Sequence, residues 1–140
     1  MENKTFTKGQ TVYLKIIKDS KEYKNLLEQT CGNLNITDII IKSEIKSITK
    51  KYITVSYNNI KFDIAKGYKQ YRRNCLEPDF DIFENIEDTI DDDCKELLWK
   101  LLKSKSNLPY LYNCPYTLKQ FKDNMEILGI KNILENLFDK

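Results

Sequence analysis

Residues 42–65 have the sequence KSEIKSITKKYITVSYNNIKFDIA, in which apolar and polar side chains alternate. Ile53 and Val55 alternate with polar neighbours, and Phe62 belongs to a second segment of the same kind. This period of two places one face of each strand on a core and the other in water. Asn58-Asn59 between the segments suits a reversal, because asparagine tolerates the left-handed backbone of a hairpin turn. The stretch therefore predicts a β-meander and makes the N-terminal half a small antiparallel sheet or barrel.

Segments on either side extend this prediction. Residues 12–16 alternate as a first strand, and residues 79–83 form a short closing strand. Residues 19–22 have the form of a capping box, with an acceptor at the N-cap and an acid three residues on. We therefore predict a small antiparallel β-barrel of about four or five strands over residues 1–84. It includes a short helical insertion near residues 20–31.

The hydrophobic period changes to that of helices after residue 85. Residues 117–120 form a second capping box, and Gly129 ends or kinks the helix that follows. We predict a helical segment over residues 85–140 that packs on the barrel as one compact unit and gives the chain an α+β fold. The side chains expected to pack are apolar and follow helical spacing: Ile90, Leu97, Leu98, Leu101, Phe121, Met125 and Leu134.

The composition of the 140-residue chain argues against several kinds of site. The chain has no histidine, which removes the side chain most often used as a general base near neutral pH. Its four cysteines contain no Cys-x-x-Cys pair, so a zinc finger is not expected, and its four glycines are isolated, so no phosphate-binding loop is indicated. We therefore expect a non-enzymatic protein with no cofactor, no metal and no catalytic residues.

The sequence also bears on where the protein works. No apolar run approaches the roughly 20 residues that span a bilayer. The N-terminal sequence MENKTFTKGQ lacks the apolar centre of a secretory signal. We expect a cytoplasmic protein that binds no membrane and keeps its cysteines reduced and mostly buried.

The net charge of +2 conceals an asymmetry along the chain. Residues 1–76 contain 15 lysines and arginines against 7 acids, whereas residues 77–140 contain 8 against 14. The two halves therefore carry opposite charges, +8 and −6, and such fields steer partners rather than set the fold.

Ten acids and one base lie between Glu77 and Glu96. One interpretation is a solvated helix start, since carboxylates suit the N-terminal end of a helix dipole. Another is that these carboxylates imitate a phosphate backbone and occupy a partner's basic groove, because duplex DNA carries about one charge per 1.7 Å. The acidic candidates for partner binding are Asp79, Asp81, Glu84, Glu87, Asp88, Asp91, Asp92 and Asp93.

Pro78-Asp79 followed by Asp93-Cys94-Lys95 also satisfies the formal pattern of metal-dependent nucleases. Those enzymes hold the carboxylates and the lysine on neighbouring strands around Mg²⁺. Here Asp93 and Lys95 fall within a predicted helix, from which they project in different directions. A nuclease is therefore kept only as a further alternative.

A basic and aromatic stretch follows the meander. Small barrels often bind nucleic acid with tyrosines that stack on bases and with lysines or arginines on phosphates. The plainer interpretation is an exposed connection kept in solution by its charges. The basic and aromatic candidates for nucleic-acid binding are Lys50, Lys51, Lys66, Tyr68, Lys69, Tyr71, Arg72 and Arg73.

Tyr110, Tyr112 and Tyr116 gather in a proline-containing segment between two predicted helices. Such a segment usually packs over the core. The alternative is a partner-binding patch, because tyrosine supplies contact area at a low cost in entropy.

Five short motifs follow one another along the chain: Lys8–Tyr13, Ile48–Val55, Lys61–Ile64, Glu96–Trp99 and Tyr116–Phe121. In the order of these motifs the chain resembles a family of small β-barrel domain proteins encoded in phages and prophages of low-GC Gram-positive bacteria. The similarity covers residues 6–128, but Lys50 replaces the glycine usual in its turn, and residues 18–37 look like an insertion. The resemblance implies a barrel with trailing helices and a phage setting, but no established activity.

The resemblance and the opposed charges together favour a non-enzymatic phage or prophage accessory protein that binds and modulates a host macromolecule. Its partner would be a host protein or ribonucleoprotein, and its most concrete form is an inhibitor of a host defence system, of the anti-CRISPR type. The alternative is a small-barrel nucleic-acid-binding regulator, and the metal-dependent nuclease is the third candidate.

Overall fold

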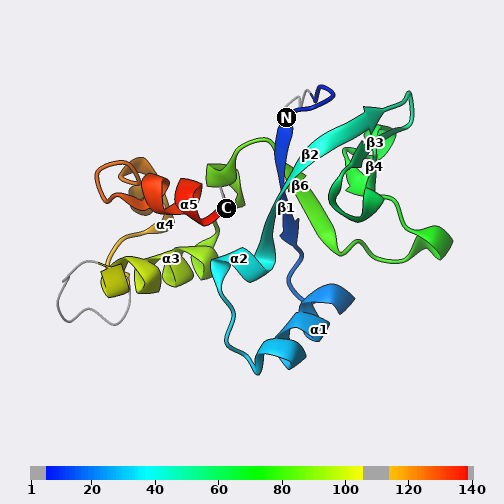
Figure 1. The fold of residues 1–140 in the computed structure, drawn as a ribbon. Helices are drawn as coiled ribbons and strands as arrows, with labels where there is room; N and C mark the ends of the chain where they lie inside the picture. Colours follow the sequence, from blue (N-terminus) through cyan, green and yellow to red (C-terminus); the bar gives the residue numbers. More distant parts are fainter. Residues whose placement is uncertain (1–5, 106–113, 139–140) are drawn as a thin grey trace.

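The computed structural model describes residues 6–105 and 114–138, and it is an α+β fold with a six-stranded antiparallel sheet that curls into a nearly closed barrel (Figure 1). The strands lie in the order β5-β4-β3-β2-β1-β6. The predicted small barrel with C-terminal helices is confirmed. The strands are β1 (Thr11–Ile16), β2 (Ile40–Ile48), β3 (Tyr52–Val55), β4 (Lys61–Asp63), β5 (Lys69–Gln70) and β6 (Phe80–Phe83).

The strand that the sequence does not predict is β5, which lies in the stretch interpreted as a connection. It has two residues and pairs with β4 through Phe62↔Gln70 and Asp63↔Lys69. Left-handed backbone at Gly67 (φ 68°) and Tyr68 (φ 63°) turns the chain back after β4. A strand this short carries no alternating pattern, so only the fold reveals it.

A side chain completes the barrel where the edge strands β5 and β6 approach each other. Gln70 Oε1 accepts hydrogen bonds from the backbone N–H of Asp79 at 2.8 Å and of Phe80 at 3.0 Å. Arg72 forms an ion pair with Asp79 beside them. The amide oxygen thus supplies an acceptor to donors that a neighbouring strand would otherwise satisfy.

The reversal between β3 and β4 is left-handed at both asparagines, with φ of 51° at Asn58 and 53° at Asn59, as the sequence predicts. The insertion holds α1 (Lys21–Thr30) and the single turn α2 (Ile36–Ile39). The N-cap of α1 is Ser20 rather than Asp19, because the Ser20 side chain accepts from Tyr23 N–H at 3.1 Å.

Three helices follow the barrel: α3 (Asp92–Lys105), α4 (Leu118–Asp123) and α5 (Ile130–Phe138). The predicted capping box begins α4, since Gln120 N–H donates to Thr117 Oγ1 at 3.2 Å and Thr117 N–H donates to Gln120 Oε1 at 3.0 Å. Gly129, with φ of 74°, separates α4 from α5. Among the described residues, no helix has the length and apolarity needed to cross a membrane.

Strand β1 lies between two hydrophobic cores. Its inward side chains Val12, Leu14 and Ile16 belong to the barrel core. Its outward side chain Tyr13 packs against the helical core, where its ring meets that of Phe138 at 6.3 Å. Figure 1 shows the same division, with α3, α4 and α5 on one side of β1 and with β3 and β4 on the other.

The helical core contains most of the side chains expected to pack there. Leu97 and Leu101 are only half-buried, because they border a groove. The insertion contributes Ile36 and Ile39 to this core, and Tyr23 contacts both cores. The insertion therefore connects the barrel core to the core of the C-terminal helices. The expected residues that are fully buried are Ile90, Leu98, Phe121, Met125 and Leu134.

We predict that Gln70→Ala lowers the free energy of unfolding by about 1–2 kcal/mol, because the N–H groups of Asp79 and Phe80 at the start of β6 lose their acceptor. Urea unfolding followed by circular dichroism measures this loss. Gln29→Ala, on the exposed surface of α1, is the matched control and should change stability by less than about 0.5 kcal/mol. Equal effects of the two substitutions would show that the barrel closes without the Gln70 side chain.

Candidate functional site

A hollow lies between the insertion and α3 in the described part of the molecule. Its cavity volume is about 580 Å³, within the usual range for ligand sites. A second hollow of about 360 Å³ shares Leu34, Leu97 and Lys100 with it, so the two form one groove, called here the α3 groove. Its lining residues are Lys15, Ile16, Lys18, Tyr23, Gly32, Asn33, Leu34, Asn35, Ile36, Thr37, Ile39, Asp91, Asp93, Glu96, Leu97, Lys100, Leu101 and Leu137.

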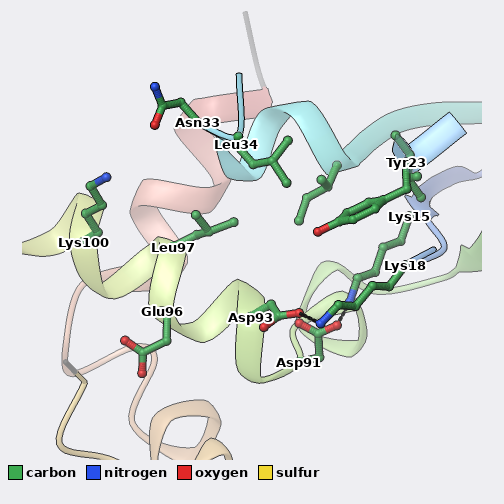
Figure 2. Close-up of a pocket in the computed structure, with 13 residues that line it drawn as sticks. Lys15, Lys18, Tyr23, Asn33, Leu34, Asp91, Asp93, Glu96, Leu97 and Lys100 are labelled. Carbon is green, nitrogen blue, oxygen red and sulfur yellow. Dashed lines mark hydrogen bonds and ion pairs between the residues drawn. The ribbon is translucent and has the colours of Figure 1, made fainter. Parts of the chain in front are cut away.

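The walls of the α3 groove are mainly apolar. Figure 2 shows Leu34 and Leu97 facing each other across it, with the Tyr23 ring extending from α1 into the space between them and Lys18. The Tyr23 hydroxyl has no hydrogen-bond partner among the described residues. A phenol in this position offers both an apolar ring and a free donor to whatever enters the groove.

Two ion pairs close one end of the groove (Figure 2). Lys15 pairs with Asp91 and also donates to the Thr89 carbonyl at 2.7 Å, while Lys18 Nζ lies 3.2 Å from Asp93 Oδ2. These contacts connect β1 and the residues just after it to the start of α3. The hydrogen bond from Lys18 to Asp93 and the attraction between their charges raise the pKa of Lys18.

Asp91 is also the N-cap of α3, since its Oδ1 accepts from Cys94 N–H at 2.9 Å. Burial by itself would raise the pKa of Asp91. The hydrogen bonds from Lys15 and from Cys94 N–H outweigh burial, so this pKa lies below the usual 3.8. The carboxylate is therefore ionised throughout the physiological pH range.

The charges around the α3 groove balance. Three lysines and three acids line it, and four of these six side chains form the two ion pairs. A lining with no net charge does not suit a polyanion, which needs uncompensated cations. An apolar floor with a balanced polar rim is instead typical of sites that take an amphipathic ligand or a side chain of a protein partner.

The structure divides the acidic candidates among β6, the 3₁₀ turn Ile86–Thr89 and the start of α3. The fold brings to ion-pair distance Asp79 and Arg72, Glu87 and Lys131, Asp91 and Lys15, Asp92 and Lys95, and Asp93 and Lys18. Asp81 lies opposite Lys15 in the β1–β6 register; Asp81 and Asp88 are exposed, and Glu84 is half-buried. Three of the basic partners, Lys15, Lys18 and Arg72, come from the basic half of the chain, so that half neutralises part of the acidic run.

The three residues of the nuclease pattern have separate partners. Asp79 pairs with Arg72, Asp93 pairs with Lys18, and Lys95 Nζ donates to the Tyr116 carbonyl at 3.0 Å. In residues 6–105 and 114–138, no group of three or more carboxylate, cysteine or histidine side chains could hold a metal ion.

The basic and aromatic candidates fall into two groups. Tyr68 packs against Phe6 at a ring distance of 4.9 Å, and Arg72 pairs with Asp79, so both contact their own molecule. Tyr71 is 46% exposed and belongs to the outer surface of the sheet. The other exposed members are Lys50, Lys51, Lys66, Lys69 and Arg73.

Sequence reasoning missed two residues that accompany Tyr71. The Tyr52 and Tyr71 rings lie 5.2 Å apart, and Lys61 Nζ lies 5.7 Å from the centre of the Tyr52 ring. The alternation of β3 was a sufficient signal, because Ile53 faces inward and Tyr52 must then face outward. The α3 groove had no such signal, since its walls come from segments far apart in the sequence.

The cysteines differ in exposure more than the sequence suggests, since Cys31 is exposed, Cys114 half-buried and Cys94 buried. Burial raises the pKa of the Cys94 thiol to about 11. Tyr116, from the predicted tyrosine patch, packs against Trp99 at a ring distance of 5.9 Å. Tyr110 and Tyr112 lie outside the described residues.

No protein-family model, curated protein or solved structure matches this chain.

We predict that Asp91→Ala lowers the free energy of unfolding by about 1 kcal/mol at neutral pH, because α3 loses its cap and Lys15 loses its partner. Asp91→Asn keeps the capping oxygen and should cost less. Because the folded-state pKa of Asp91 is depressed, the stabilisation by its charge is present above the unfolded-state value and is lost as pH falls through the folded one.

Thermal unfolding at a series of pH values measures this effect. The difference between the wild-type protein and Asp91→Asn should shrink as pH falls from about 5 to about 3. A difference that stays constant over this range would mean that the Asp91 charge contributes nothing to stability.

We predict that iodoacetamide at about pH 8 alkylates Cys31 in the folded protein and leaves Cys94 unmodified, because the thiolate is the reactive form and burial suppresses it at Cys94. Peptide mass spectrometry identifies the modified residues. In denaturant both thiols should react, and rapid alkylation of Cys94 without denaturant would contradict the buried position.

Proposed function

We propose that this protein is a non-enzymatic accessory protein that binds and modulates a host macromolecule. The most concrete form is an inhibitor of a host defence system, of the anti-CRISPR type, that acts on a protein or ribonucleoprotein in the cytoplasm of a bacterial host. The phage setting implied by the resemblance supports this form. The observation that carries the binding role is the α3 groove.

The α3 groove suits a protein partner for three reasons. It has apolar walls that a partner's aliphatic or aromatic side chain would cover, and such buried anchors dominate the affinity of protein interfaces. Its rim carries balanced charges, which fix orientation without attracting polyanions. Its Tyr23 hydroxyl offers a hydrogen bond that the described residues leave unmade.

Binding without turnover is sufficient for an inhibitor. A partner held in the groove would contact α3 through Leu97 and Leu101, which are half-buried in the free protein. Both residues line the second hollow, so a partner that fills the groove would cover the same face of α3 along its length. The groove therefore fits an amphipathic segment laid along α3.

The experiment expresses the protein in a bacterium with an active CRISPR–Cas system and measures the plating efficiency of a targeted phage. The wild-type protein should raise this efficiency, and Leu97→Glu should abolish the effect, since a charged side chain in the groove disfavours an apolar anchor. Ile127→Glu is the matched control, because Ile127 is 84% exposed and outside the groove. It should keep the wild-type effect.

Two outcomes would overturn this proposal. If the wild-type protein gives no protection, the anti-CRISPR form is wrong. If folded Leu97→Glu, verified by circular dichroism, protects as well as Ile127→Glu does, the α3 groove is not the binding site.

A further inference from the structure

We infer that the outer face of β3, β4 and β5 binds single-stranded nucleic acid. This site is separate from the α3 groove and goes beyond the function proposed for the groove. It is called here the β3–β5 face and consists of Lys50, Lys51, Tyr52, Lys61, Lys66, Lys69, Tyr71 and Arg73.

The strand register places the central members of this face, Tyr52, Lys61, Lys69 and Tyr71, together. Ile53 and Phe62 are paired and buried in the barrel, so their neighbours Tyr52 and Lys61 face outward. Tyr71 N–H donates to the Lys61 carbonyl at 2.8 Å, which sets Tyr71 beside Lys61 on the adjoining strand. The face therefore spans three neighbouring strands rather than one exposed loop.

Its two tyrosines do not serve either core. Tyr52 and Tyr71 are absent from both hydrophobic clusters, yet their rings lie 5.2 Å apart and Tyr71 is 46% exposed. Lys61 Nζ, 5.7 Å from the centre of the Tyr52 ring, adds a cation beside this aromatic pair. Tyr52 is half-buried, and aromatic rings next to a lysine can serve as a platform on which unpaired bases stack.

The positive charge of this face is in excess. Among the described residues, none of its lysines nor Arg73 forms an ion pair, whereas Lys15, Lys18, Arg72 and Lys95 all do. The backbone bond from Ile64 N–H to the Lys51 carbonyl, at 2.9 Å, brings the β2–β3 turn against the end of β4. Asp63, the only carboxylate within β3, β4 and β5, pairs in register with Tyr52 and Lys69 and so lies on the same face, where it accepts from Ala65 N–H at 3.0 Å. Five lysines and Arg73 therefore stand against one carboxylate.

The chemistry of the face favours a single strand over a duplex. A duplex buries the faces of its bases in its own stack and offers mainly phosphates. A single strand offers phosphates to the lysines and base faces to Tyr52 and Tyr71 at once. Because the bases are read by stacking, little sequence preference is expected.

The test measures the fluorescence anisotropy of a labelled 15-residue oligothymidine and of a 15-base-pair duplex, each titrated with the full chain at about 50 and 200 mM NaCl. The single strand should bind about 10-fold more tightly than the duplex. Its affinity should fall with salt at a logarithmic slope of about −2 to −4, as expected for three to five phosphate contacts.

Variants locate the site. Tyr71→Ala should weaken binding about 10-fold, while Tyr71→Phe, which keeps the stacking ring, should bind nearly as the wild-type protein does. Lys69→Glu and Lys119→Glu change the net charge equally, and both lysines are exposed, but Lys119 lies on α4. Lys69→Glu should therefore weaken binding more than Lys119→Glu does.

Three results would overturn the inference: no binding of the single strand at about 50 mM NaCl, equal binding of duplex and single strand, or equal effects of the two lysine substitutions. The Lys69 and Lys119 pair keeps the test decisive if Tyr71→Ala does not fold. Neither these results nor the binding data depend on Leu97, so a failure here leaves the groove proposal standing.

Discussion

The constraint on which the rest of the structure depends is that β1 serves two cores at once. Its even-numbered side chains Val12 and Leu14 fill the barrel, while Tyr13 on the opposite face packs against the helical core. Because side chains alternate along a strand, a shift of one residue would exchange these faces and break both cores together. The register of β1 therefore fixes the helices relative to the barrel, and the α3 groove lies in the space between them.

Electrostatics follows from the same arrangement. Lys15 in β1 and Lys18 just after it pair with Asp91 and Asp93 at the N-terminal end of α3. The opposite charges of the two halves of the sequence therefore partly neutralise each other through ion pairs within the molecule. Six cations that form no ion pair among the described residues, the five lysines and Arg73 of the β3–β5 face, lie far along the sheet from α3 (Figure 1). Part of the asymmetry along the chain therefore remains as a local basic patch on the folded protein.

What the sequence could predict was local. The strand β3, the left-handed asparagines and the capping box at Thr117 depend on neighbours in the chain, and all three occur in the structure, although Thr54, expected on the water-facing side of β3, is buried. The closure by Gln70 and the walls of the α3 groove depend on contacts between distant segments, which no short pattern encodes. Tyr52 was predictable in part. Its outward direction follows from the alternation of side chains along a strand, but its contact with the Tyr71 ring depends on the position of β5.

The two proposed binding surfaces depend on different interactions. A single partner that bound both would therefore have to present two kinds of chemistry. Binding in the α3 groove, which is apolar and has no net charge, would depend on burial of apolar area and would be insensitive to salt. Binding at the β3–β5 face would depend on its lysines, so salt would weaken it. No residue belongs to both surfaces. A ribonucleoprotein, the class of partner that we propose, presents a protein surface and exposed single-stranded nucleic acid together, so its chemistry would match both proposed sites.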